Sequence, residues 1–204
     1  MRLFSSPTSP FCRKVLACAL ARSIPIEELF VDLRTAHFYQ INPLGQIPAL
    51  QTDEGDTLFD SDVIVQYLDT CHHGPLLIGG DRFSSMTRIH LANGMMEAVL
   101  QRLLELRRPE EQRHQATLDH LEQRVARVLT ALEKTAPDAP GASLSAVDIA
   151  TMCALEYVDF RYPHDWRAQH EALAAWHKSL CEREPFARTR PTRTAPVVQP
   201  TRAI

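Results

Sequence analysis

The spacing of apolar residues changes about a third of the way along this chain. Before residue 75, alternating polar and apolar residues predict short strands, and apolar residues three and four positions apart predict helices. The predicted order is strand, helix, strand, weak helix, strand, strand, helix. The first, second and fourth strands are expected at 2–5, 29–31 and 57–59, and the third strand is expected to end at residue 50. The helices are expected at 10–22, weakly at 32–40, and from 60 onward.

The second part of the chain carries a helical pattern throughout. Residues 74–81, with three glycines and a proline, separate it from the first part. Ser145 and Asp148 have the spacing of a capping box, and Leu144 and Ile149 occupy the positions of a hydrophobic staple. The helix that follows is apolar on nearly every side, so we expect it at the buried centre of its domain. The other helices are expected at 86–107, from 109 onward, and at 173–184.

This order predicts an α/β domain of modest size followed by an all-α domain. We place the first domain at 1–76, the second at 82–190, and a tail at 191–204. Residues 187–204 contain four Arg, three Pro and no acid, a composition typical of a segment that is disordered or lies along the surface.

Composition excludes several classes of protein. The chain has 204 residues, 45% of them hydrophobic, and a formal net charge of -3, which gives no electrostatic case for binding nucleic acid or an anionic membrane. It contains neither an apolar run of about 18 residues nor a signal peptide at the start. Five scattered cysteines without a CxxC or zinc-ligand spacing favour a reducing cytoplasm, and we expect no structural metal.

The first predicted helix begins with a candidate anion site. Pro10 suits the first helical position, which places Ser9 at the N-cap, beside free backbone N–H groups and the positive end of the helix dipole. Such a site favours a thiolate, a carboxylate or a phosphate. The simpler interpretation is that Ser9 only caps its helix. Cys12 lies one turn further on, and we interpret it first as a packed helix residue and second as a catalytic one.

Four motifs in this order resemble the glutathione S-transferase superfamily, in particular its bacterial serine-type members. They cover almost the whole chain, from residue 2 to about 191. The resemblance implies a thioredoxin-like N-terminal domain, an all-α C-terminal domain, and glutathione as co-substrate. The motifs are Ser9-Pro10-Phe11-Cys12-Arg13, the segment 42–50 with a cis peptide bond before Pro48, Asp60-Ser61, and Ser145-x-x-Asp148.

The same resemblance assigns roles in holding glutathione. Asp60 and Ser61, at a helix start, would bind the γ-glutamyl head, although an ordinary N-cap is the alternative. Ile47, ahead of Pro48, would pair through its backbone with the tripeptide. Gln46 is the best placed of three residues for the glycine carboxylate or the peptide. The remaining candidates are Phe11 as a further cofactor contact and, less well aligned, Arg34 and His37.

Ser9 would stabilise the glutathione thiolate, which then attacks a small hydrophobic electrophile. A free thiol titrates near about 8.5, so a hydroxyl donor at a helix end increases the reactive fraction at neutral pH. The second substrate would lie against one stretch of the second domain, although a helix face bearing methionines also suits a core. The residues expected there are Met95, Met96, Val99, Arg102 and Leu103.

Two other functions remain open at this stage. A thiol oxidoreductase of the same fold would reduce glutathione mixed disulfides through Cys12. A non-catalytic interaction or stress protein would keep the fold without turnover, since a fold does not imply a function. The resemblance further implies a cytoplasmic homodimer with a role in detoxification.

Overall fold

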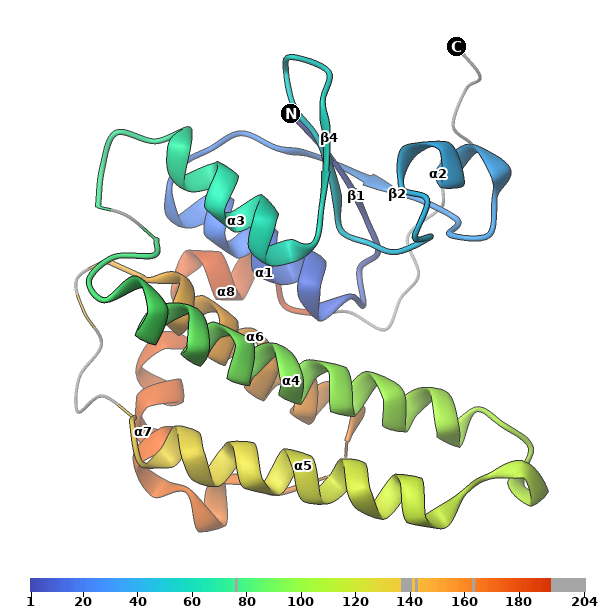
Figure 1. Ribbon diagram of the computed structural model, residues 1–204. Coiled ribbons are helices and arrows are strands. Elements are labelled where there is room, and N and C mark those ends of the chain that lie inside the picture. Colours follow the sequence, from blue (N-terminus) through green and yellow to red (C-terminus); the bar gives the residue numbers. More distant parts are fainter. Residues whose placement is uncertain (76, 137–140, 142, 163, 192–204) are drawn as a thin grey trace.

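The chain forms a small mixed sheet with flanking helices, followed by a set of longer helices (Figure 1). The computed structural model describes residues 1–75, 77–136, 141, 143–162 and 164–191. The N-terminal elements are β1 (Arg2–Ser5), α1 (Pro10–Ala21), β2 (Glu27–Phe30), α2 (Ala36–Ile41), β3 (Ala49–Gln51), β4 (Thr57–Phe59) and α3 (Ser61–Thr70). The later elements are α4 (Arg82–Leu106), η1 (Glu110–Gln112), α5 (Gln115–Glu133), α6 (Ala146–Arg161), η2 (Arg167–Gln169), α7 (Glu171–Leu180) and α8 (Glu184–Arg188).

The four strands lie in the order β2-β1-β3-β4, with β1 and β2 parallel and the other pairs antiparallel. Because successive side chains of a strand point to opposite faces, Leu3 and Phe4 enter two different clusters. Leu3 joins the main core with α1 and α3, on the side of the sheet that faces the helical domain. Phe4 packs on the other face, edge-on to Phe38 of α2 at a centroid distance of 6.3 Å.

The prediction that α6 lies at the centre of the second domain is confirmed. Nearly every residue from Ala146 to Val158 is buried. The predicted capping box is present, with Ser145 Oγ accepting from the Asp148 N–H at 3.2 Å and Asp148 Oδ2 accepting from the Ser145 N–H at 2.9 Å. Capping satisfies backbone groups that the apolar surroundings of α6 would otherwise leave unpaired.

Several predicted boundaries are wrong. The second strand begins earlier, at Glu27, and the weak helix is limited to α2. The stretch after Pro109 forms the short η1 turn before α5 begins. The helix expected at 173–184 is α7, which begins at Glu171 and ends at Leu180, and the separate short helix α8 follows with Pro185 in its first turn. Most of the tail, residues 192–204, lies outside the described residues.

The glycine-rich segment after α3 packs against both domains. Leu77 and Ile78 are buried, and their N–H groups donate to the Asp69 carboxylate at 2.6 and 3.0 Å. The Leu77 carbonyl accepts from the Ala146 N–H at 2.8 Å, so the segment joins the end of α3 to the start of α6. Within the described part of the chain, no helix has the length and hydropathy needed to cross a bilayer.

Candidate functional site

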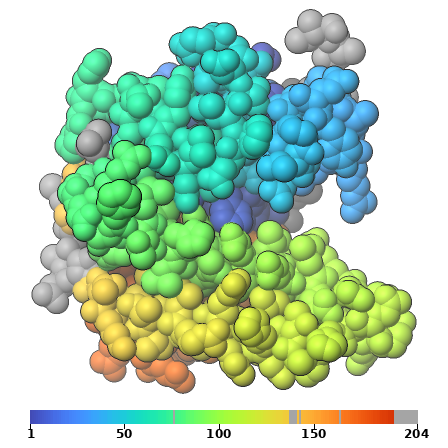
Figure 2. All heavy atoms as spheres, viewed as in Figure 1, coloured from blue at the N-terminus to red at the C-terminus, as the bar shows by residue number. Residues whose placement is uncertain are grey.

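The residues singled out in the first domain meet at one edge of the sheet. In the register, Ala49 of β3 pairs with Phe4 of β1 on one side and with Phe59 of β4 on the other. The chain leaves β1 toward Ser9, enters β3 from Pro48, and leaves β4 into Asp60, so these three points share one end of the sheet. In Figure 2, dark blue atoms from near the start of the chain are visible between the first domain and the helical domain.

Ser9 caps α1 as predicted. Its Oγ accepts a hydrogen bond from the Cys12 N–H at 3.3 Å, and Pro10 takes the first helical position. Ser9 is half-buried, with its N–H bonded to the Ser6 carbonyl at 3.0 Å. Because the oxygen accepts from the backbone, the hydroxyl hydrogen can be donated to a group outside the helix.

The Ile47-Pro48 peptide bond is cis, as expected. Asn42 holds the loop before it: the buried Asn42 side chain donates to the Gln46 carbonyl at 2.7 Å and accepts from the Leu44 N–H at 3.0 Å. Gln46 is therefore exposed on a fixed backbone, while Ile47 is half-buried. Sequence reasoning missed Asn42, although an Asn whose side chain can bond the N–H two residues further on is a common signal for a turn.

Asp60 is the N-cap of α3, and its backbone has a φ of 72°. A positive φ is uncommon outside glycine, and Asp and Asn are among the residues that adopt it. Its Oδ1 accepts from the N–H groups of Asp62 and Val63 at 2.7 and 3.3 Å. Asp60 is exposed, whereas Ser61 beside it is buried with 5% of its surface accessible. The N-cap role and the expected ligand role of Asp60 are thus compatible, since only Oδ1 caps the helix.

Cys12 is buried behind Ser9, with 1% of its surface accessible. Burial raises the pKa of its thiol to about 11, against opposing hydrogen bonds from Ser9 and Ser5. Very little of this thiol is ionised at neutral pH. The geometry therefore agrees with a packed helix residue and gives the oxidoreductase alternative little support.

Two buried cations fix the start of α1 against its neighbours. Lys14 contacts Asp62 of α3 and donates to Asn93 of α4 at 2.9 Å, and Asn93 Nδ2 donates to Asp62 at 2.8 Å. Arg13, which is 5% accessible, contacts Glu156 of α6. Buried charges need such partners, because an unpaired charge in the interior is strongly destabilising.

Arg13 also reaches the end of the described chain. It donates to the Phe186 carbonyl and to Thr189, each at 3.2 Å. At the far end of α1, Arg22 Nη2 donates to the Leu144 carbonyl at 3.0 Å, next to the start of α6. Polar contacts at both ends of α1 therefore hold this helix, and with it the Ser9 turn, in place against the helical domain.

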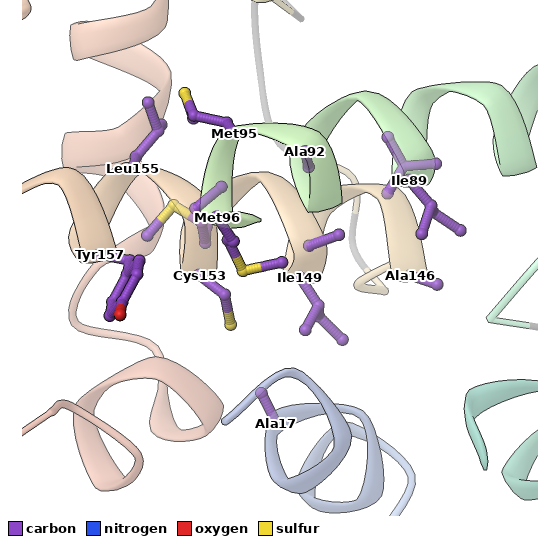
Figure 3. Packing of buried hydrophobic residues seen from close by; sticks show 14 of the residues in the cluster. Ala17, Ile89, Ala92, Met95, Met96, Ala146, Ile149, Cys153, Leu155 and Tyr157 are labelled. Atoms are coloured by element: carbon purple, nitrogen blue, oxygen red, sulfur yellow. The ribbon is translucent and has the colours of Figure 1, made fainter. Parts of the chain in front are cut away.

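Most of the predicted second-substrate wall is wrong. Met95, Met96 and Val99 are at most 1% accessible and belong to the core, where Figure 3 shows the two methionines among packed side chains. Arg102 is engaged elsewhere, with Nε 2.7 Å from Glu122 and its guanidinium 4.3 Å above the Tyr162 ring. Leu103 is half-buried, and its role stays a prediction.

The face of α4 that turns toward the first domain is marked by Asn93, which contacts Lys14. At about 100° per residue, Leu100, Leu104 and Arg107 lie within roughly 40° of Asn93, whereas Arg102 lies roughly opposite. Leu100 is half-buried, Arg107 is exposed, and Leu104 is 50% accessible. Asn93 is a polar residue among apolar neighbours in the sequence, and a helical wheel centred on it would have identified this face of α4.

A separate cavity of about 370 Å³ lies away from Ser9. It is bounded by Met1, the Ser23 turn, the β3–β4 hairpin at Asp53, and the end of α3 at Cys71. These residues belong to the opposite end of the sheet, so the cavity is not part of the Ser9 site. Among the described residues, no group of three His, Cys, Asp or Glu side chains is arranged to hold a metal ion.

The cis-proline before β3, the capped α1 and the helical second domain define a two-domain protein of the thioredoxin-like class. Residues 8–71 match the family model of the glutathione S-transferase N-terminal domain, and residues 115–179 match that of the C-terminal domain. A relative described as the uncharacterized GST-like protein YibF of Escherichia coli (strain K12) is 33% identical over 201 residues, which covers 94% of this chain and 98% of the relative. The chain belongs to the glutathione S-transferase superfamily.

Two solved structures agree with this assignment. A glutathione transferase family member from Pseudomonas fluorescens Pf-5, with bound glutathione, has a TM-score of 0.86 at 34% identity and covers 94% of this chain and 98% of that chain. A second structure of a family member from the same strain has bound S-(propanoic acid)-glutathione, with a TM-score of 0.83, 34% identity, and coverage of 94% and 100%.

Proposed function

We propose that this protein is a glutathione transferase that binds glutathione at the sheet edge beside Ser9 and transfers its sulfur to a small hydrophobic electrophile. The observation that carries the proposal is the meeting of the Ser9 cap, the Ile47-Pro48 turn and the start of α3 at one edge of the sheet. The glutathione bound in a neighbour of 34% identity supports it.

The γ-glutamyl head would bind at the start of α3. The helix N-terminus and the Ser61 hydroxyl favour its α-carboxylate. Asp60 uses Oδ1 to cap the helix, and its Oδ2 is the oxygen that would accept from the α-ammonium. The tripeptide backbone would lie along Ile47, with Gln46 and Phe11 as further contacts, and its cysteine would then reach Ser9.

Ser9 would donate its hydroxyl hydrogen to the sulfur and so favour the thiolate. Each unit by which the thiol pKa falls corresponds to about 1.4 kcal/mol and a tenfold change in the ratio of thiolate to thiol. The thiolate then forms a C–S bond as the electrophile loses its leaving group with the bonding electron pair, and the thiol proton goes to solvent. Ser9 itself forms no covalent bond.

The test is a Ser9→Ala variant with Ser6→Ala as its control in the same turn. We expect Ser9→Ala to lower kcat/KM for a reference electrophile such as 1-chloro-2,4-dinitrobenzene by about 10- to 100-fold, because the thiolate loses its donor. Glutathione affinity, measured by calorimetry, should change little. The Ser6 hydroxyl lies 3.5 Å from Thr8 Oγ1, so its removal should leave the rate nearly unchanged.

The same measurements separate the alternatives. If calorimetry detects no heat of binding with millimolar glutathione, the transferase and the oxidoreductase are both excluded and the non-catalytic protein remains. Reduction of glutathione mixed disulfides that survives Ser9→Ala and is lost in Cys12→Ala would favour the oxidoreductase. A homodimer, a cytoplasmic location and a role in detoxification follow from the family resemblance and stay predictions; sedimentation at micromolar protein checks the first.

A further inference from the structure

A closed set of buried hydrogen bonds lies behind the start of α3. Lys14 of α1 contacts Asp62 Oδ1 and donates to Asn93 Oδ1 of α4 at 2.9 Å, and Asn93 Nδ2 donates to Asp62 Oδ2 at 2.8 Å. Lys14 is 1% accessible, and Asn93 is 6% accessible. Because α1 packs on both α3 and α4 (Figure 1), these contacts join the helix that begins at Ser9 to the proposed glutathione site at the start of α3.

The first turn of α3 keeps two donors for a ligand. Asp60 Oδ1 accepts from the N–H groups of Asp62 and Val63 and so uses the next two donors of this turn. Within the described part of the chain, neither the N–H nor the hydroxyl of Ser61 has a hydrogen-bond partner, although Ser61 is only 5% accessible. Both groups can therefore be donated to an anion at this end of the helix.

Asp62 is the second acid at this helix start, and its carboxylate is a natural competitor for that anion position. Acidic side chains are attracted to the free N–H groups of a helix start, and Asp62 directly follows Ser61. Lys14 and Asn93 instead occupy one carboxylate oxygen each, which holds Asp62 on the side of α3 that faces α1 and α4. The Lys14 ammonium also neutralises the Asp62 charge.

The charges of this region balance when the γ-glutamyl head of glutathione is bound. Asp60 Oδ2 would accept from the α-ammonium, and Lys14 already pairs with Asp62. The α-carboxylate then meets the helix end and Ser61 without an unpaired acid beside it. Loss of the Lys14 charge would leave two neighbouring carboxylates, one from the protein and one from the ligand, and like charges so close together repel.

We propose that Lys14 is a positioning residue for glutathione: it neutralises Asp62 and, with Asn93, holds it away from the helix end, so that the start of α3 can bind the α-carboxylate. This inference rests on the proposed function and concerns the same site. Lys14 acts through Asp62 and does not touch the ligand, because it is sealed between the helices. Its effect is one of charge and therefore depends on the carboxylate of the ligand.

The test measures, by calorimetry, the affinity for glutathione and for γ-aminobutyryl-cysteinyl-glycine, which lacks the α-carboxylate. Lys14→Met should weaken glutathione binding by about tenfold or more, because the unpaired Asp62 repels that carboxylate. The same variant should bind the analogue within about twofold of the wild-type protein, because the analogue has no charge at that position. Asp62→Asn removes the acid and keeps the cation, so it should bind glutathione at least as tightly as the wild-type protein.

Two controls remove comparable groups away from the start of α3. Arg22→Met removes another buried cation of α1, at the far end of that helix. Asp69→Asn removes a carboxylate at the opposite end of α3, where it accepts from the Leu77 and Ile78 N–H groups. Both variants should lose stability and keep the glutathione affinity of the wild-type protein. If they lose affinity as Lys14→Met does, the effect is one of stability and the inference is wrong.

Equal weakening of both ligands by Lys14→Met, or weaker glutathione binding in Asp62→Asn, would show a merely structural role and overturn the inference, while the proposed function would stand. If the wild-type protein fails to bind glutathione, both proposals are wrong. Because an unpaired Asp62 could disturb folding, circular dichroism melting curves identify any variant that is not folded. The Lys14→Met, Asp62→Asn double variant removes both charges and should bind glutathione within about threefold of the wild-type protein. A tenfold loss in the folded double variant would contradict charge compensation.

Discussion

Neighbouring residues at the tip of α1 have different environments, and these decide their chemistry. Ser9 is half-buried, and its hydroxyl hydrogen can be donated. Cys12 is buried beneath it, and Arg13 forms an ion pair across the domain interface. The thiol is the stronger nucleophile in isolation. Its burial removes that advantage, because the ionised form is disfavoured in an apolar surrounding.

At the residue scale, we predict that Cys12 resists alkylation. At pH 7.5, iodoacetamide should modify the exposed Cys71 at least about 100-fold faster than Cys12, because a pKa near 11 leaves almost no Cys12 thiolate. Timed labelling followed by peptide mass spectrometry measures both rates. In urea the two rates should become similar. Comparable rates in the folded protein would contradict the burial argument and revive the oxidoreductase.

At the scale of single elements, the start of α6 is specified locally, while the face of α4 that turns toward the first domain is not. Ser145 and Asp148 satisfy each other's backbone within four residues, so the sequence alone predicts where α6 begins. On α4, apolar residues occupy the core side and, at Leu100 and Leu104, also the side facing the first domain. Periodicity cannot tell these two apolar faces apart.

We predict that Ser145→Ala lowers the free energy of unfolding by about 1–2 kcal/mol, the usual effect of removing an N-cap side chain. Urea unfolding followed by circular dichroism measures the change. Ser143→Ala removes an exposed hydroxyl two residues earlier and serves as the control, with an expected change below about 0.5 kcal/mol. Equal effects of the two substitutions would show that the capping box contributes no specific stability.

At the scale of the whole molecule, buried polar contacts hold the two domains together. Glu156 is the central acid of one such group: it contacts Arg13 of α1, and its Oε1 lies 3.4 Å from His177 Nε2 of α7. Burial by itself would raise the pKa of Glu156. The nearby His177 and the charge of Arg13 outweigh that effect and hold the pKa below its usual value.

We predict that Glu156→Gln destabilises the protein by about 3–5 kcal/mol at pH 7, because Arg13 keeps a buried charge without its partner. A carboxyl whose pKa is lowered by folding stabilises the protein above its unfolded pKa, and this contribution is lost as the pH falls through the folded value. The difference between variant and wild type should therefore shrink below about pH 4.5. Urea unfolding at several pH values measures it.

The control for this prediction replaces both partners. Arg13→Met combined with Glu156→Leu removes both charges from the interface and should recover much of the lost stability, because replacing a buried pair by apolar residues is often nearly neutral. A double variant as unstable as the single one would show that shape, rather than unpaired charge, accounts for the loss.

The cis peptide bond before Pro48 was predicted from the resemblance to the glutathione S-transferase superfamily. The sequence by itself determined the α/β and all-α halves, the four strands, and the caps of α1, α3 and α6. These features arise from contacts within a few residues, or from periodicities that burial of one face imposes. The helix boundaries near Pro109 and Cys181 could not be predicted from the sequence, because short turns leave a weak periodic signal. Only the tertiary structure decided that Cys12 is sealed and that Met95, Met96 and Val99 belong to the core. Those outcomes depend on which face of each helix meets another element, and that choice is made by packing between residues far apart in the chain.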